Sequence, residues 1–364
     1  PVRDAGGGGG FSFWRDRTAP KSYTVTWWDV FDTVTVVTGY ASSEEEWQQQ
    51  TEALHQDLVR YHQLFDIYNE YDGLTNLATV NARAGQEAVM VDEDLFALLQ
   101  FGQEAYALTD GACNIAAGSV LALWHDVRTA AEAATGETAL TADILPQQDA
   151  LEQAAAHIDM TDLVLDESAC TVRFIDPDLQ LDVGGIAKGW AVEQAARQAE
   201  ARGLTSAILN VGGNVRAIGT KPDGSLWTAG VQDPDGNEYL AQVELQPGQS
   251  LVVSGDYQRY FTVDGVRYHH LIDLQTLQPA RYCRSVAVLC TDSGLGDALS
   301  TGLFCLPQEQ GLRVLEQSDG AAALWVLEDG TLSPSANLAP VISIQTKRPF
   351  LPDARPGKVF CFFR

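Results

Sequence analysis

A glycine-containing segment in the middle of the chain, Leu181-Asp-Val-Gly-Gly-Ile-Ala-Lys-Gly-Trp-Ala-Val, carries the clearest chemical signal. Its composition predicts a strand that ends at Asp182, a glycine turn, and a helix that begins near Ala187. Glycines let backbone N–H groups approach a ligand, and a helix N-terminus favours an anion. Lys188 adds a positive charge at that end. The pattern is neither a Walker loop nor a Rossmann fingerprint, so a phosphate site and a plain strand-to-helix connection both stay open.

A second segment, Gly296-Asp-Ala-Leu-Ser-Thr-Gly, is expected near the start of a helix. Asp297 and Thr301 are four residues apart, so their oxygens lie on one helix face. A carboxylate and a hydroxyl provide part of a shell for Mg²⁺, which phosphate oxygens and water would complete. Alternatively, Asp297 complements the helix dipole and Thr301 bonds back to the preceding turn. Taken alone, the segment favours the second interpretation.

Two adjacent histidines belong to a third region, Ser254-Gly-Asp-Tyr-Gln-Arg-Tyr-Phe followed by Gly265-Val-Arg-Tyr-His-His-Leu-Ile-Asp. Consecutive side chains on a strand point to opposite faces, so at most one of His269 and His270 faces a given cleft. Histidine is the side chain best suited to take a proton from a hydroxyl near neutral pH. Since most strand histidines are structural, this region by itself identifies only a candidate base.

Two further turns contain glycine. Thr109-Asp-Gly-Ala-Cys-Asn-Ile-Ala follows a predicted helix directly, and a C-cap glycine explains it locally. Ile208-Leu-Asn-Val-Gly-Gly-Asn-Val is typical of a strand that runs into a turn, which either admits a ligand backbone or only reverses the chain. Each signal is weak in isolation.

The elements that must position these residues mix strand and helix patterns without a strict βαβ order, which predicts an α+β fold. We expect one globular unit over 23–340, a flexible N-terminal segment at 1–22 and a C-terminal tail at 341–364. Helices are predicted at 43–68, 94–109, 188–202 and 293–306, with surface helices in the alanine-rich region 129–156. Strands are predicted as a hairpin at 23–28 and 33–37, and at 163–165, 172–175, 206–211, 227–232, 251–254, 260–263 and 285–290.

Charge and composition exclude several classes of protein. With 23 basic and 49 acidic residues the net charge is −26, which repels nucleic acid and anionic membrane surfaces, so neither is expected as a partner. An anionic ligand therefore needs a cation, a lysine or backbone N–H groups at its site. The six cysteines form no C-x-x-C pair, which argues against a zinc ribbon or a thioredoxin-like site. No stretch approaches the roughly 18 apolar residues of a membrane-spanning helix.

The order of these motifs resembles the ApbE family of FAD:protein FMN transferases. The series starts with Y-H-x-L-F-D-x-Y and the T-D-G-A turn and continues through L-D-x-G-G-I-A-K-G-x-A-V and N-x-G-G-N. It ends with S-G-D-Y-x-R-Y-F, H-x-I-D and D-A-L-S-T, so that the resemblance covers Phe31 to Leu306. It implies a T-fold-like α+β architecture, with antiparallel sheets, packed helices and FAD bound in a cleft between two halves.

The resemblance also implies ligands and roles. Mg²⁺ would be held by the backbone oxygen of Gly185 and the side chains of Asp297 and Thr301. His270 stands where the family carries the histidine implicated in the transfer. Contacts with FAD are implied for Phe31, Tyr71, Ala112, Cys113, Asn114, Asp182, Lys188 and His270.

Two positions depart from the family pattern. Cys113 stands where the family often has phenylalanine or methionine, which alters packing against the flavin rather than the phosphate chemistry. Leu274-Gln-Thr-Leu replaces the usual P-x-T-G after the H-x-I-D segment. The loop beyond Asp273 is therefore expected to differ in shape.

The implied reaction is Mg²⁺-dependent transfer of FMN from FAD to a serine or threonine hydroxyl of an acceptor flavoprotein subunit, with AMP as the leaving group. Two alternatives stay open: an FAD pyrophosphatase, in which water replaces the acceptor, and a non-catalytic FAD-binding protein. An acceptor role is disfavoured, because Asp110-Gly-Ala is followed by Cys113 and not by a hydroxyl residue. By family analogy the protein would be extracytoplasmic and membrane-associated, although no signal or lipidated cysteine is visible in this chain.

Overall fold

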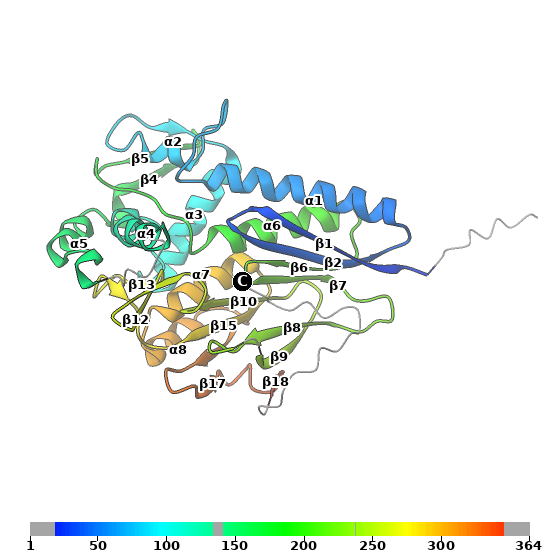
Figure 1. The fold of residues 1–364 in the computed structure, drawn as a ribbon. Helices are drawn as coiled ribbons and strands as arrows, with labels where there is room; N and C mark the ends of the chain where they lie inside the picture. The colour runs from blue at the N-terminus through cyan, green and yellow to red at the C-terminus, as the bar shows by residue number, and fades with distance from the viewer. Residues whose placement is uncertain (1–18, 134–140, 237, 346–364) are drawn as a thin grey trace, which may run out of the picture.

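An eight-stranded antiparallel sheet forms the centre of the molecule in the computed structural model, which describes residues 19–133, 141–236 and 238–345 (Figure 1). Its strand order is β1-β2-β6-β7-β10-β15-β16-β17. Each neighbouring pair is antiparallel. The strands are β1 (Lys21–Val30), β2 (Thr33–Ala41), β6 (Ser206–Val211), β7 (Asn214–Gly219), β10 (Ser250–Gly255), β15 (Ser285–Cys290), β16 (Ala322–Val326) and β17 (Leu332–Pro334).

Three helices cover one face of this sheet: α1 (Glu44–Phe65), α6 (Ala187–Ala201) and α7 (Ser293–Phe304) (Figure 1). Helix α1 begins where the side chain of Ser43 accepts a hydrogen bond from Glu46 N–H, which satisfies one of the free N–H groups of the first turn. Its apolar stripe points into the core at helical spacing, through Leu54, Leu58, Tyr61, Leu64 and Phe65.

The opposite face packs on a three-stranded sheet of β8 (Trp227–Gln232), β9 (Tyr239–Leu245) and β18 (Ile342–Ile344). Trp227 and Leu251 belong to the apolar cluster between the two sheets. Because both faces of the central sheet are covered, β6 and β10 are buried at every residue. This explains why they appear in the sequence as continuous apolar runs and not as alternating ones.

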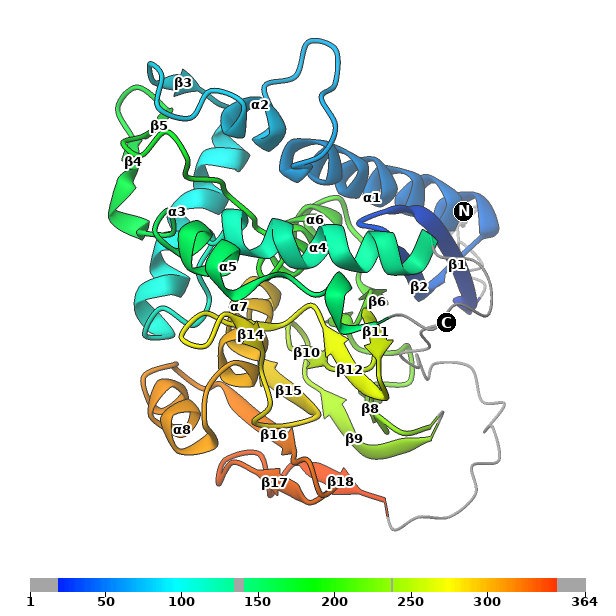
Figure 2. The same cartoon turned by 60° about the vertical axis from the view of Figure 1, so that its left-hand side comes forward.

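A further group of elements, here called the α4 layer, encloses an apolar cluster of its own (Figure 2). It consists of α4 (Gly118–Ala133), α5 (Gln148–Ala155), the hairpin of β11 (Tyr260–Val263) and β12 (Val266–His269), and the pair β13 (Ile272–Asp273) and β14 (Gln278–Pro279). Trp124 of α4 is buried there, and its indole N–H donates to Leu277 O at 3.0 Å.

The remaining elements are α2 (Leu77–Asn81), β3 (Val89–Met90), α3 (Glu93–Leu108), β4 (Leu163–Asp166), β5 (Thr171–Phe174), α8 (Gln308–Glu316) and two 3-10 turns at Ala142–Ile144 and Met160–Asp162.

The predicted α+β class is confirmed, including its antiparallel sheets and packed helices. The predicted helices correspond to α1, α3, α6 and α7, with ends shifted by less than one turn. The predicted hairpin is the β1–β2 pair. Within the described ranges, no helix is both long and apolar enough to cross a membrane.

The structure differs from the sequence prediction in several elements. Helix α4 begins at Gly118, before the alanine-rich region 129–156, and residues 134–140 of that region lie outside the described part. Strands β9 and β16 and helix α8 are absent from the prediction. Strand β18 lies inside the segment 341–364 that was expected as a tail, because its backbone pairs with β9, a distant segment that local pattern does not reveal.

Candidate active site

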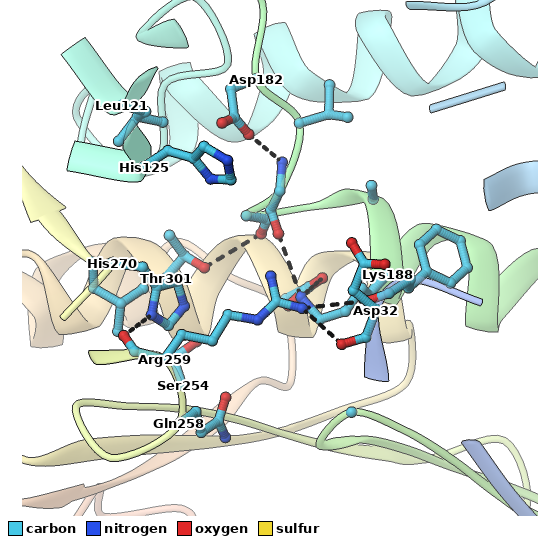
Figure 3. Close-up of a pocket in the computed structure, with 18 of the residues that line it drawn as sticks. Asp32, Leu121, His125, Asp182, Lys188, Ser254, Gln258, Arg259, His270 and Thr301 are labelled. Atoms are coloured by element: carbon cyan, nitrogen blue, oxygen red, sulfur yellow. Dashed lines mark hydrogen bonds and ion pairs between the residues drawn. The ribbon is translucent and has the colours of Figure 1, made fainter. Parts of the chain in front are cut away.

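A cavity of about 720 Å³ opens between the helix-covered face of the central sheet and the α4 layer (Figure 3). Its volume lies within the range of about 300–1,000 Å³ that is typical of small-molecule sites. Tyr71 is the one predicted site residue that does not line it. The others all do: Phe31, Ala112, Cys113, Asn114, Asp182, Gly185, Lys188, His270, Asp297 and Thr301.

The glycine turn before α6 lies directly against α7. Gly184 N–H donates to Asp182 Oδ1 at 2.8 Å, so the carboxylate shapes the turn. Thr301 Oγ1 donates to Gly185 O at 3.3 Å. The two motifs, distant in sequence, therefore form one wall of the pocket.

Asp297 is held at the contact between α6 and α7. It is 3% exposed, its Oδ2 accepts a hydrogen bond from Gly189 N–H at 2.8 Å, and Lys188 Nζ lies 3.9 Å away. Burial raises the pKa of Asp297, and the charge of Lys188 offsets only part of that effect. A Cβ on Gly189 would lie 2.2 Å from Ser293 O, so only glycine allows the helices to approach this closely.

Three kinds of oxygen donor meet here: the carbonyl of Gly185, the hydroxyl of Thr301 and the carboxylate of Asp297. Oxygen ligands of this kind suit a hard divalent cation such as Mg²⁺. Among the described residues, Lys188 at 3.9 Å is the one ion-pair partner of the buried Asp297 carboxylate. The residues present therefore fit such a cation.

Both adjacent histidines line the pocket, contrary to the expectation that at most one would, because β12 ends at His269 and His270 lies beyond the strand. Their environments differ. His269 is buried, its Nδ1 accepts from Leu271 N–H at 3.3 Å, its Nε2 donates to Ala280 O at 3.0 Å, and burial lowers its pKa to about 4. His270 Nδ1 lies 3.3 Å from Arg259 O, and since a carbonyl only accepts, Nδ1 carries the proton. The pKa of His270 is well below its usual value. The main cause is burial, which disfavours the charged ring, and the positive charge of Arg259 is the next largest cause. Near pH 7 its ring is therefore neutral, with the lone pair on Nε2.

The tip of the β1–β2 hairpin forms another part of the wall. Phe31 and Asp32 have φ angles of 56° and 49°, in the left-handed region that non-glycine residues rarely adopt. Phe31 N–H donates to His62 Nδ1 at 3.2 Å, and the two rings meet edge to face. The hairpin tip is thus fixed at the cavity in an uncommon conformation.

The turn after α3 presents mainly backbone to the pocket. Cys113 is buried, its N–H donates to Thr109 Oγ1 at 3.0 Å, and burial raises the pKa of its thiol to about 12, so the thiol is unreactive. The side chain of Asn114 donates to Ile158 O at 2.9 Å and accepts from Ala116 N–H at 2.8 Å. It holds the shape of the turn.

Tyr71 reaches the pocket only through a neighbour. Its hydroxyl donates to Asp66 Oδ2 at 2.8 Å, and Asp66 lines the pocket. Asp66 also accepts from the backbone N–H groups of Tyr68 and Asn69. Burial would raise the pKa of Asp66, but these hydrogen bonds lower it. Asp66 therefore organises the loop that carries Tyr71.

Several polar pocket residues are absent from the sequence prediction, among them Asp66 and Arg128 and also His125 and Arg259, which Figure 3 labels. Arg259 and Asp66 both lie inside motifs that the sequence already singles out. His125 and Arg128 share one face of α4, a spacing that is visible in the sequence. The sequence does not show that this helix borders the pocket.

A separate cluster lies on the surface. His157 Nδ1 is 2.7 Å from Asp176 Oδ2, and its Nε2 is 4.0 Å from Asp178 Oδ2. These groups could hold a metal ion, but the histidine and the carboxylates already pair with one another. The cluster lies outside the set of residues that line the pocket.

Comparisons with known proteins agree with this architecture. The chain is 31% identical to the FAD:protein FMN transferase of Klebsiella pneumoniae (strain 342) over 282 residues, which cover 73% of this chain and 81% of the relative. It is 32% identical to the FAD:protein FMN transferase of Treponema pallidum (strain Nichols) over 287 residues, which cover 75% of this chain and 76% of the relative.

Solved structures show the same fold. The crystal structure of the ApbE protein from Thermotoga maritima matches with a TM-score of 0.76 at 29% identity, covering 88% of this chain and 99% of that one. The flavin transferase ApbE from Vibrio cholerae matches with a TM-score of 0.73 at 22% identity, with the same coverage of both chains. The model of the ApbE family itself matches residues 29–325. The chain therefore belongs to the ApbE family.

Proposed function

We propose that this protein is a FAD:protein FMN transferase. A serine or threonine hydroxyl of an acceptor protein attacks the FMN-side phosphorus of FAD. A bond forms between that oxygen and the phosphorus, the bond from the phosphorus to the adenylate oxygen breaks, and AMP leaves. The observation that carries the proposal is the convergence of Lys188, Asp297 and His270 on one pocket beside the glycine turn. The two relatives described above bear the name of this activity.

Positive charge is the first requirement of the reaction, because the protein has a net charge of −26 and the substrate is a diphosphate. Gly185 O and the side chains of Asp297 and Thr301 would hold Mg²⁺. Bound Mg²⁺ would supply charge that offsets the negative phosphates. Lys188 and the N–H groups at the start of α6 would add a second source of positive charge.

His270 would act as the base toward the acceptor hydroxyl. Its Nδ1 is committed to Arg259 O, so Nε2 is the atom that would take the proton. Because its pKa is lowered, the ring is in the proton-accepting form at neutral pH. Phe31, Asp182 and the turn at 112–114 would contact the rest of FAD, and Tyr71 would act only through Asp66.

Mass spectrometry of an acceptor flavoprotein subunit, after incubation with this protein, FAD and Mg²⁺, tests the proposal. The expected result is FMN covalently attached to a serine or threonine, with one AMP released per FMN attached. Free FMN as the only flavin product would identify a pyrophosphatase. Intact FAD after prolonged incubation would identify a flavin-binding protein.

We also propose, on family analogy alone, that the protein acts outside the cytoplasm and at a membrane. Fractionation of cells that make the full-length protein, followed by protease treatment of intact cells, tests this. Recovery of the protein only from the cytoplasm would contradict it.

A further inference from the structure

The guanidinium groups of two pocket arginines have no part in the mechanism proposed above, although the carbonyl of Arg259 orients His270. Arg259 lies between β10 and β11, Arg128 lies on α4, and both line the cavity. In a protein with more than twice as many acidic as basic residues, two guanidinium groups in one cavity form an unusual concentration of positive charge. Their neighbours show how each is held.

Arg128 is oriented by its own helix. Its Nη2 lies 3.0 Å from His125 Nδ1 and its Nε lies 3.5 Å from Glu132 Oε1. Since arginine only donates, His125 Nδ1 is an unprotonated acceptor. Tyr68 Oη lies 3.1 Å from the same nitrogen, and the tyrosine ring stacks on the imidazole. His125 and Tyr68 thus fix the direction of a guanidinium that is only 15% exposed.

Arg259 is held by backbone and not by a carboxylate. Its Nη2 donates to Phe31 O and Asp32 O, each at 3.3 Å, the two residues of the left-handed hairpin tip. In the part of the chain that the structure describes, no carboxylate forms an ion pair with it, whereas Arg284 pairs with Asp256 at 2.7 Å. Its positive charge therefore stays available to a ligand.

The two arginines act on each other. The pKa of Arg259 is lowered mainly by burial, and the positive charge of Arg128 is the next largest cause. Both arginines, with His125, also act on Asp182 in the same cavity. Repulsion between like charges in a confined space is relieved when an anion binds between them. The arrangement is that of a preformed anion site.

We infer that Arg128 and Arg259 bind the phosphate of the adenylate half of FAD and stabilise it as AMP leaves, with His125 and Tyr68 as positioning residues. The inference rests on the proposed transferase function. When the bond to phosphorus breaks, the electron pair goes to the adenylate oxygen, so negative charge increases on AMP. A guanidinium fork matches phosphate oxygens in two-point geometry, and cations already in place need no rearrangement as this charge develops.

The test separates the two halves of FAD. Dissociation constants of AMP and of riboflavin are measured by calorimetry for the wild type, Arg128→Gln, Arg259→Gln and Arg259→Lys. As a matched control we choose Arg313→Gln, on the exposed face of α8. We expect Arg128→Gln and Arg259→Gln each to weaken AMP binding by about 10- to 100-fold, with riboflavin binding and the control unchanged. Arg259→Lys keeps the charge and should retain part of the affinity.

Positioning by His125 is tested with a double mutant. His125→Phe should weaken AMP binding in the wild type but add little to Arg128→Gln, because both changes remove the same interaction. Additive losses would exclude the positioning role.

Normal AMP affinity in both arginine variants would overturn the inference. A higher KM for the acceptor protein, with AMP binding unchanged, would also overturn it, because the arginines would then contact the acceptor and not AMP. If the wild type binds AMP through the arginines but transfers no FMN, the transferase proposal fails and the phosphate site stands. If the wild type transfers FMN and the variants bind AMP normally, only the inference fails.

Discussion

Two groups of charged residues near α6 have different environments in the same fold. The first, here called the α6 ion network, is centred on Glu193, which is 1% exposed. Glu193 accepts from Arg216 Nε at 3.1 Å, from Arg197 Nε at 2.8 Å and from Ser293 N–H at 3.0 Å. Burial would raise the pKa of Glu193, but Arg216 and the other donors lower it. Each buried charge in the network therefore has an oppositely charged partner.

The second group lines the pocket, and its charges are only partly matched. Burial raises the pKa of Asp182 and Asp297, while Arg259 lacks a carboxylate partner within the described residues. The comparison indicates that the fold gives the charges around Glu193, away from the pocket lining, oppositely charged partners. In the pocket it leaves charges partly unpaired, where a ligand can complete them. The predictions below test this contrast, from the largest expected effect to the smallest.

Replacement of Asp297 by Ala should reduce FMN transfer to background. The carboxylate is the one negative ligand of the proposed Mg²⁺ site, and a metal ion contributes several kcal/mol to stabilising a phosphoryl transition state. Transfer is measured by in-gel flavin fluorescence of the acceptor, with Glu309→Gln on the surface as the control. The free energy of unfolding in urea should not fall sharply, because burying a carboxylate with little compensating charge is itself unfavourable and the variant removes that cost. Undiminished transfer would show that the metal site is wrongly placed.

His270→Ala should lower transfer by about 10²- to 10⁴-fold, the usual contribution of a general base. FAD affinity should stay within a few-fold, since the diphosphate contacts come from other residues. Stopped-flow transfer rates and FAD titration separate the two quantities. Equal losses of FAD binding and transfer would instead make His270 a binding residue.

Glu193→Ala should lower the free energy of unfolding by about 3–5 kcal/mol, because it leaves Arg216 buried without its partner. Urea denaturation followed by circular dichroism measures the change. The matched control is Glu309→Ala, an exposed glutamate of α8 with an i,i+4 arginine partner, which should change stability by less than about 0.5 kcal/mol. A large loss in the control, or none in Glu193→Ala, would remove the contrast between the two groups.

The smallest effect concerns pH. His269 has a pKa of about 4 in the folded protein, below its usual 6.5, so the unfolded chain binds the proton first. Its contribution to stability is complete above pH 6.5 and is lost as pH falls toward 4, by at most about 1.4 kcal/mol per pH unit. Urea unfolding at about pH 5 and about pH 7.5 should therefore show a smaller pH dependence in His269→Gln than in the wild type. An identical dependence would contradict the assignment.

The sequence predicted the parts of the site that depend on local geometry. Asp297 and Thr301 share a face of α7 because helical periodicity places residues four apart side by side. The glycine turn before Lys188 leads into a helix as predicted. The choice of His270 came from the family resemblance and not from local geometry. Both histidines line the pocket, but backbone groups occupy both nitrogens of His269, whereas His270 is bound through Nδ1. The roles of these residues stay predictions until the variants are measured.

Local pattern determined where helices, turns and chemical groups occur, because periodicity and glycine content act over a few residues. Only the tertiary structure decided which groups come together: Arg128 and Arg259 line one pocket, Tyr71 donates to Asp66, and β18 pairs with β9. It also decided the charge states, since the pKa of His270 or Asp297 depends on water exclusion and on partners from distant segments. The grouping of distant residues and their protonation states arise when long-range packing excludes water. Local sequence pattern does not show which segments pack together, so it does not predict them.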